Sequence, residues 1–213
     1  PGRDDGRGMT WFALCLLHGH GVAADEARAL ALMRQAAERG AALAQYWLGR
    51  FHYAGQHVGR DFAAAARHLE AAAAQGFAPA CDLLARCRFF GRGAIEDRPG
   101  AVRLWRIAAA AELPAAMFCL GMCLYAGEGA AADPAEAVSW FRAAARKQLT
   151  GAMFLLGQCY TFGLGATRDP EAGLAWYRRA AEGGNREAAF ELGVAQATGR
   201  GAAGQNMDEA LTW

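Results

Sequence analysis

Six small residues recur along the chain at intervals of 36 residues: Ala13, Gly49, Ala85, Gly121, Gly157 and Gly193. A spacing kept this strictly over 213 residues indicates that the whole chain is an array of repeated units. In such arrays each unit contacts mainly its neighbours, and the extended surface serves binding. We refer to these six positions as the anchors.

Every unit continues with a glycine loop and then an aspartate. A glycine stands six residues after each anchor and a second stands eight residues after it in five units, with His57 replacing it in the second unit. Glycine allows the positive φ that ends a helix, and an aspartate side chain can accept hydrogen bonds from the free amides of a helix start. A second helix is therefore predicted after each of Asp25, Asp61, Asp97, Asp133 and Asp169.

Alanine pairs such as Ala144–Ala145, preceded by large apolar residues such as Phe141, mark the second helices as packing elements. The pattern predicts helices near 44–54 and 61–75 with equivalents every 36 residues, separated by turns at Gly40, Gly76 and Gly184. Gly121 and Gly157 are expected where a first helix touches its second helix. Asp133 and Glu136 have the spacing of a capping box.

These residues resemble the Sel1-like repeat family. The fourth and fifth units carry the resemblance best, with FCLGMCLYAGEGAAADPAEAVSWFRAAA and FLLGQCYTFGLGATRDPEAGLAWYRRAAEGG. The resemblance covers residues 1–213 and implies an all-α, right-handed superhelical solenoid of about six helix-turn-helix units related to tetratricopeptide repeats. The sixth unit departs from the pattern because Asp208 and Ala210 fall late. Neither Pro1 nor Trp213 looks like a capping end, so we expect both ends to be cut from a longer protein.

The charge balance argues against a nucleic-acid partner. The chain has 22 basic and 21 acidic residues, a net charge of +1, and no dense basic cluster. It has no apolar run long enough to span a bilayer, so membrane insertion is not expected. The compartment stays open: unpaired cysteines favour a reducing cytoplasm, with the periplasm or secretion as alternatives.

The six cysteines are expected to be free thiols. Equivalent positions in successive units lie about 10 Å or more apart, which is too far for a disulfide. The resemblance implies a second test, because cysteine-rich relatives tie the end of a second helix to the next first helix. Cys81 has the later position, but residues 72–74 are alanines, so that pairing is missing.

No catalytic residue, cofactor or metal ligand set emerges from the sequence. Cys15, His18 and His20 could form part of a metal site, but they cross a helix end and have no fourth ligand nearby. The glycine loops could cradle a phosphate, but no lysine follows them and an aspartate occupies the helix start. We expect the loops to be structural and the protein not to be an enzyme.

A concave surface lined by first helices is the expected binding site, as in related helical repeats. Aromatic and arginine side chains on these helices are typical of binding hot spots, and they suit an acidic and apolar protein or peptide partner. The position three after the anchor holds five residue types in six units, which also favours recognition. The residues are Leu16, His52, Arg88, Leu124, Tyr160 and Gln196. Trp11 is a further candidate; the predicted partner-binding residues are Trp47, Arg50, Tyr53, Arg86, Phe89, Phe90, Met122, Tyr125, Gln158 and Phe162.

Three functions remain open at this point. A protein–protein interaction scaffold is favoured because the repeats leave no catalytic constellation. The resemblance to cysteine-rich relatives implies an alternative, which is binding or hydrolysis of cell-wall or β-lactam-like compounds. The third is a regulatory repeat segment that positions other domains of a larger protein.

The cysteine interpretation predicts that a thiol reagent added to the denatured, unreduced protein will titrate six thiols. The reason is the separation of equivalent cysteines and the alanines at residues 72–74. Mass spectrometry of the alkylated protein checks the count. A disulfide between any two of the six would overturn the interpretation.

Overall fold

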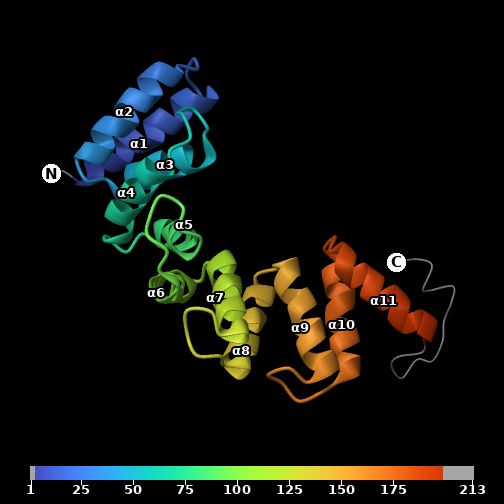
Figure 1. Ribbon diagram of the computed structural model, residues 1–213. Helices are drawn as coiled ribbons and strands as arrows, with labels where there is room; N and C mark the ends of the chain where they lie inside the picture. The colour runs from blue at the N-terminus through green and yellow to red at the C-terminus, as the bar shows by residue number, and fades with distance from the viewer. Residues whose placement is uncertain (1–2, 199–213) are drawn as a thin grey trace. The chain divides into compact units, whose positions relative to one another are not determined.

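The structure, a computed structural model, describes residues 3–198, which form eleven α-helices and no strand (Figure 1). The helices that were predicted near 44–54 and 61–75 are confirmed within two residues at each end. In chain order they are α1 (Arg3–His18), α2 (Glu26–Glu38), α3 (Ala42–Ala54), α4 (Phe62–Ala73), α5 (Ala78–Phe89), α6 (Arg98–Ala110), α7 (Pro114–Ala126), α8 (Pro134–Arg146), α9 (Thr150–Phe162), α10 (Pro170–Glu182) and α11 (Arg186–Thr198).

The helices gather into two compact units, divided between Ala111 and Glu112. The first unit holds α1 to α6 and the second holds α7 to α11. Within each unit the chain alternates between the first and the second helix of successive repeats, and each first helix packs on the second helix that follows it. Asp208 and Ala210, predicted to begin the last second helix, lie outside the described residues.

Each second helix begins at the predicted aspartate, which holds the chain in two ways. The side chains of all five aspartates accept a hydrogen bond from the amide three residues later, at 2.8–3.0 Å. Their own amides donate to the carbonyl nine residues earlier, on the preceding first helix, also at 2.8–3.0 Å. In the fourth repeat Asp133 caps the amide of Glu136, while the Glu136 carboxylate accepts from the indole of Trp140.

The second glycine of the loop allows one repeat to pack on the repeat before it. A Cβ on Gly93 would overlap the carbonyl of Phe62 at the start of α4, and a Cβ on Gly165 would overlap the carbonyl of Pro134 at the start of α8. In the second repeat His57 takes this place with a φ of +62°. Its ring reaches Glu26, the first residue of α2, at 3.0 Å. A side-chain contact therefore replaces the contact between main chains.

The turns that lead into first helices share one left-handed residue. Gly40, Gly76 and Gly184 have φ between +75° and +87°, as their sequence pattern predicted. Glu112 and Gln148 occupy the equivalent places with φ of +60° and +63°. No glycine marks these two turns in the sequence, yet the repeat keeps the same left-handed backbone there, at a higher conformational cost for a residue with a side chain.

Side chains also link successive turns within a unit. The Gln75 amide donates to the carbonyl of Gly40 at 2.9 Å, and at the equivalent place two repeats later Lys147 Nζ lies 2.8 Å from Glu112 Oε2. The Lys147 ammonium lowers the pKa of the Glu112 carboxyl. Both links join a residue at the end of a second helix to the turn one repeat earlier.

The anchors lie where first and second helices come closest, as predicted. A Cβ on Gly49 would stand 2.7 Å from Cγ of Leu69, and one on Gly121 would stand 2.6 Å from Cε1 of Phe141. Gly157 meets the ring of Tyr177 in the same way. Because the large residue always comes from the second helix, the small anchor is what lets it lie flat on the first helix.

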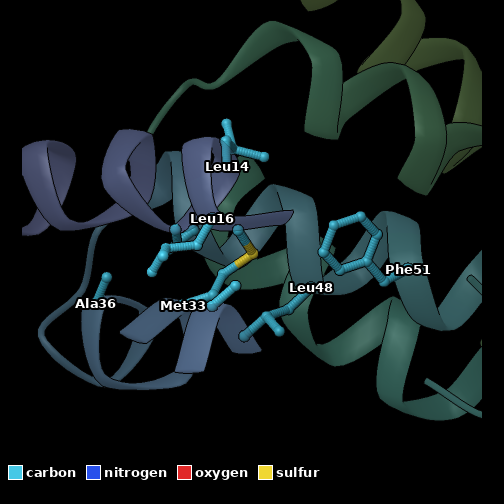
Figure 2. Packing of buried hydrophobic residues seen from close by; sticks show 9 residues of the cluster. Leu14, Leu16, Met33, Ala36, Leu48 and Phe51 are labelled. Atoms are coloured by element: carbon cyan, nitrogen blue, oxygen red, sulfur yellow. The ribbon is translucent and has the colours of Figure 1, made fainter. Parts of the chain in front are cut away.

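The hydrophobic clusters of the first unit are shared between successive repeats. Figure 2 shows side chains of α1, α2 and α3 meeting in one cluster, in which Met33 is fully buried. The labelled members are Leu14, Leu16, Met33, Ala36, Leu48 and Phe51. Residues of three helices share the cluster, so no repeat of this unit buries its apolar face alone.

We predict that Gly121→Leu destabilises the protein by about 1–3 kcal/mol, because the new side chain would overlap the Phe141 ring. Gly8→Leu is the matched control, since a Cβ on Gly8 of α1 meets nothing within 4 Å. The control is expected to unfold at the same denaturant concentration as the parent or higher, because glycine weakens a helix. Equal stability of Gly121→Leu and the parent in urea unfolding would contradict the close-contact interpretation.

The left-handed turn residues generate a second prediction. Gln148→Gly is expected to stabilise the protein by about 1 kcal/mol, because glycine adopts positive φ without a clash between Cβ and the carbonyl. The reverse change, Gly184→Gln, is expected to destabilise it by a similar amount. Urea unfolding of both variants measures the two shifts, and shifts of the same sign would contradict the prediction.

Candidate functional site

The predicted residues of α3 lie partly on the core and partly in solvent. Trp47 is half-buried, with its ring centroid 5.7 Å from that of the buried Phe51. The exposed guanidinium of Arg50 lies 4.8 Å above the Trp47 ring. This cation–π arrangement leaves the other face of the guanidinium and its N–H groups accessible to a partner.

Tyr53 is connected to α5 through a loop residue that sequence reasoning missed. Nη1 of Arg92 donates to the Tyr53 hydroxyl at 2.9 Å, and the same guanidinium lies 5.2 Å from the centroid of the Phe90 ring. Phe90 is 58% exposed. Within the described residues Arg92 makes no ion pair; its guanidinium contacts one ring face and one hydroxyl.

Phe89 continues this set of contacts toward α6. Its ring centroid lies 5.0 Å from that of Phe90 and 5.3 Å from that of Trp105. The guanidinium of Arg98, the first residue of α6, lies 5.1 Å from the Phe89 ring. We call Tyr53, Phe89, Phe90, Arg92 and Arg98 the aromatic–arginine cluster; it lies at the glycine-loop end of α3 and α5.

Arg86 has a structural partner rather than a free guanidinium. Its Nε lies 3.3 Å from Oδ2 of Asp82, one helical turn earlier, and Oδ1 of Asp82 accepts from the indole of Trp105 at 2.9 Å. Trp105 is buried and Asp82 is mostly buried. Arg86 therefore helps to hold α6 on α5.

A usable signal for Arg92 was present in the sequence. It stands between the two glycines of its loop, and the equivalent residues are His20, Gln56, Glu128, Leu164 and Arg200. The variation that was sought three residues after the anchor is thus also found in the loop. Arg98 gave no comparable signal, because it simply follows the capping aspartate.

The variable position three after the anchor does not form a free surface, so that interpretation was wrong. Leu16 and Leu124 are buried there. Three of the other four residues pair with second helices: His52 stacks on His68 at 5.8 Å, Arg88 lies 3.1 Å from Glu70, and the Tyr160 hydroxyl accepts from Arg142. The fourth, Gln196, is partly buried. The position varies because each pair of helices makes its own contact.

The predicted residues of the second unit are accessible but separate. Met122, Tyr125 and Phe162 are 38–57% exposed, and Gln158 is partly buried. Among the residues up to 198, none of these four side chains makes a hydrogen bond or a ring contact. They offer contact area without the organisation of the aromatic–arginine cluster.

The described side chains offer no metal centre, and burial keeps two of the thiols protonated. No group of three His, Cys, Asp or Glu residues between positions 3 and 198 could hold a metal ion, and the His18 and His20 rings lie 5.5 Å apart. All six cysteines are unbridged. Burial raises the pKa of Cys87 and of Cys159 to about 11, so both remain protonated at neutral pH.

Among residues 3–198, no helix combines the length and the apolar character that crossing a bilayer requires.

Comparison with known families and structures identifies the repeats. The Sel1 repeat model matches residues 6–40, 42–77, 78–113, 114–149, 150–185 and 186–213. A search of curated proteins gives no significant match.

Solved structures show the same fold. A protective antigen present in uropathogenic Escherichia coli strains is 27% identical with a TM-score of 0.90; the match covers 98% of this chain and 44% of the antigen. A Sel1 repeat protein from Oxalobacter formigenes is 29% identical with a TM-score of 0.85, covering 98% of this chain and 85% of that one. A Klebsiella pneumoniae protein described as a Sel1 repeat protein is 19% identical, with a TM-score of 0.56 over 88% of this chain and 91% of that one.

The chain thus spans less than half of the E. coli antigen and most of the O. formigenes protein. The family model covers six consecutive repeats, and the described helices alternate as those repeats require. With its all-α superhelical repeat fold, the chain belongs to the Sel1 repeat family.

Proposed function

We propose that this chain is an interaction scaffold that binds an acidic and apolar peptide on the aromatic–arginine cluster. Sel1 repeat proteins are generally protein-interaction scaffolds, and their solenoid fold is typically non-catalytic. The observation that carries the proposal is Arg92, which contacts both Tyr53 and Phe90 and has no carboxylate partner among the described residues.

The residue types of the cluster support this choice of partner. Tyrosine, phenylalanine and arginine concentrate binding energy, because they cover large areas and lose few rotamers on binding. The Tyr53 hydroxyl and the Phe90 ring restrain Arg92 before a partner arrives, which reduces the entropy that binding would cost. A carboxylate of the partner would supply the charge that Arg92 lacks.

The exposed ring of Phe90 gives the apolar half of the proposed specificity. It contacts the ring of Phe89, which in turn contacts the buried Trp105. The two phenylalanine rings therefore form an apolar surface that is supported by Trp105. A leucine or phenylalanine next to an acidic residue of the partner would cover it. Trp47 and Arg50 are proposed to add contacts for a longer partner of the first unit. Met122, Tyr125, Gln158 and Phe162 are proposed as partner contacts of the second unit by itself.

The proposal predicts which peptides the chain selects from a random displayed library of 12-residue peptides. Selected sequences are expected to combine Asp or Glu with leucine or an aromatic residue. Affinities of the synthetic peptides, measured by fluorescence anisotropy, are expected to fall when lysine replaces the acids and when salt is raised. Equal binding of the charge-reversed peptides would contradict the proposal.

Variants locate the site. Arg92→Ala and Phe90→Ala are expected to weaken binding of a selected peptide by about 30-fold, the effect of losing about 2 kcal/mol at a hot spot. Arg28→Ala and Ile107→Ala, exposed residues of second helices in the same unit, are matched controls and should bind within about twofold of the parent. Arg86→Ala is less informative, because Arg86 supports Asp82 and Trp105. If Arg92→Ala and Phe90→Ala weaken binding no more than the control variants do, the peptide does not bind at the aromatic–arginine cluster.

A further inference from the structure

A cavity of about 470 Å³ lies at the other end of α3 from the aromatic–arginine cluster, within the first unit. Its walls come from α1, from the turn that leads into α3, and from the residues that follow α4. The lining residues that matter for its chemistry are Arg7, Trp11, Arg39, Ala42, Leu43 and Phe77. The volume is within the usual range for small-ligand sites, about 300–1,000 Å³.

Several contacts fix the walls of this cavity. Nη1 of Arg39 donates to Asp5 at 2.6 Å and lies 3.4 Å from the sulfur of Met9. Nε2 of Gln75, another lining residue, donates to the carbonyl of Gly40 and to Oε1 of Gln45, both at 2.9 Å. These hydrogen bonds restrain Arg39 and Gln75, two of the residues that line the cavity.

The charged groups that line the cavity are guanidinium groups. Arg7 is exposed and makes no ion pair with the described side chains, and Arg39 shares its charge only with Asp5. Among the described side chains, no acidic residue lines the cavity. The first turn of α3 lines it as well, and Ala41 provides no side-chain acceptor for that turn, whereas an aspartate caps α2 and α4. Two guanidinium groups and uncapped amides face one space without a carboxylate in its lining.

The rest of the lining is apolar and aromatic. Trp11 is 54% exposed, although its equivalent one repeat later, Trp47, packs on Tyr46 and Phe51. Phe77 stands in the wall next to the small side chains of Ala41 and Ala42. A ligand that filled the cavity would cover the Trp11 indole, which is otherwise left in solvent.

From this arrangement we infer that the cavity binds an apolar group that carries a carboxylate. The apolar group lies against Trp11 and Phe77, and the carboxylate lies between Arg7 and the start of α3. Two sources supply this chemistry: a free aromatic or branched aliphatic acid, and the last residue of a peptide. The inference is independent of the proposed function, because no residue of the aromatic–arginine cluster lines the cavity.

The second unit has a cavity of about 730 Å³ at a similar place, beside Gln148 and Thr150. It also contains two arginines and a tryptophan: Arg146, Arg179 and Trp176. The guanidinium of Arg179 lies 4.9 Å from the Trp176 ring, and Glu182 contributes an acid to the lining. A carboxylate ligand would be repelled by Glu182, so the inference is confined to the first unit.

The test uses N-acetyl-phenylalanine, its amide, and a five-residue alanine peptide that ends in phenylalanine, prepared as acid and as amide. Heteronuclear NMR of the labelled protein follows the Ala42 and Leu43 amides and the Trp11 indole. At least one acid is expected to shift these signals saturably, with a Kd of about 1 mM for a ligand of this size. Its amide is expected to bind at least about fivefold more weakly. Binding of the free acid alone indicates a small-molecule ligand, and binding of the peptide acid alone indicates a chain terminus.

Variants separate the cavity from nonspecific association. Arg7→Gln and Trp11→Ala are each expected to raise the Kd of the binding acid at least about fivefold. Arg28→Gln is the matched control, because Arg28 lies over the Phe12 ring outside the cavity, and it should leave the Kd unchanged. Thermal unfolding of each variant shows that it is folded. Equal binding of acid and amide, no binding of either acid, or unchanged binding by both cavity variants would overturn the inference.

Discussion

The repeats depend on the capping aspartate, which fixes the path of the chain through hydrogen bonds of both its main chain and its side chain. The main-chain amide of each aspartate donates a hydrogen bond to a carbonyl of the first helix. Its carboxylate accepts a hydrogen bond from a main-chain amide of the second helix. These bonds attach the loop to the first helix and begin the second helix at a fixed distance from the first. An asparagine could cap a helix similarly, but a carboxylate also favours the positive end of the helix dipole.

The remaining packing follows from that fixed distance. Once the two helices leave the loop at one separation, the anchor must be small wherever the facing residue is large, as at Gly121 and Phe141. The separation also decides which aromatic rings are buried. Trp105 faces its own first helix and is buried, whereas Phe90 lies past the end of α5 and stays exposed.

Much of this fold could be predicted from the sequence, because its signals are local. Asp61 predicted the start of α4, and the spacing of the glycines predicted the end of α3. Both signals act over a few residues. The left-handed Gln148 could not be predicted, since the neighbouring repeats impose its conformation against its own preference. For the candidate site, residue type singled out Tyr53 and Phe90, while the contact of Arg92 with both depends on the three-dimensional structure. Arg86 looked equally suitable, and its pairing with Asp82 depends on a contact to Trp105 from another helix.

The second glycine of the loop has a consequence for how such arrays change over time. Where Gly93 packs on α4, the nearest atoms of the earlier repeat belong to the main chain of Phe62 and Ala63; at Gly165 the two nearest are the carbonyl atoms of Pro134, followed by its Cβ. Because most of these atoms are common to every residue type, such a junction depends little on the side chains of the earlier repeat, and a duplicated, deleted or transposed repeat can find a compatible neighbour. The junction at His57 is different, because it uses the carboxylate of Glu26. The first two repeats are therefore joined by a contact that depends on the side chains of both.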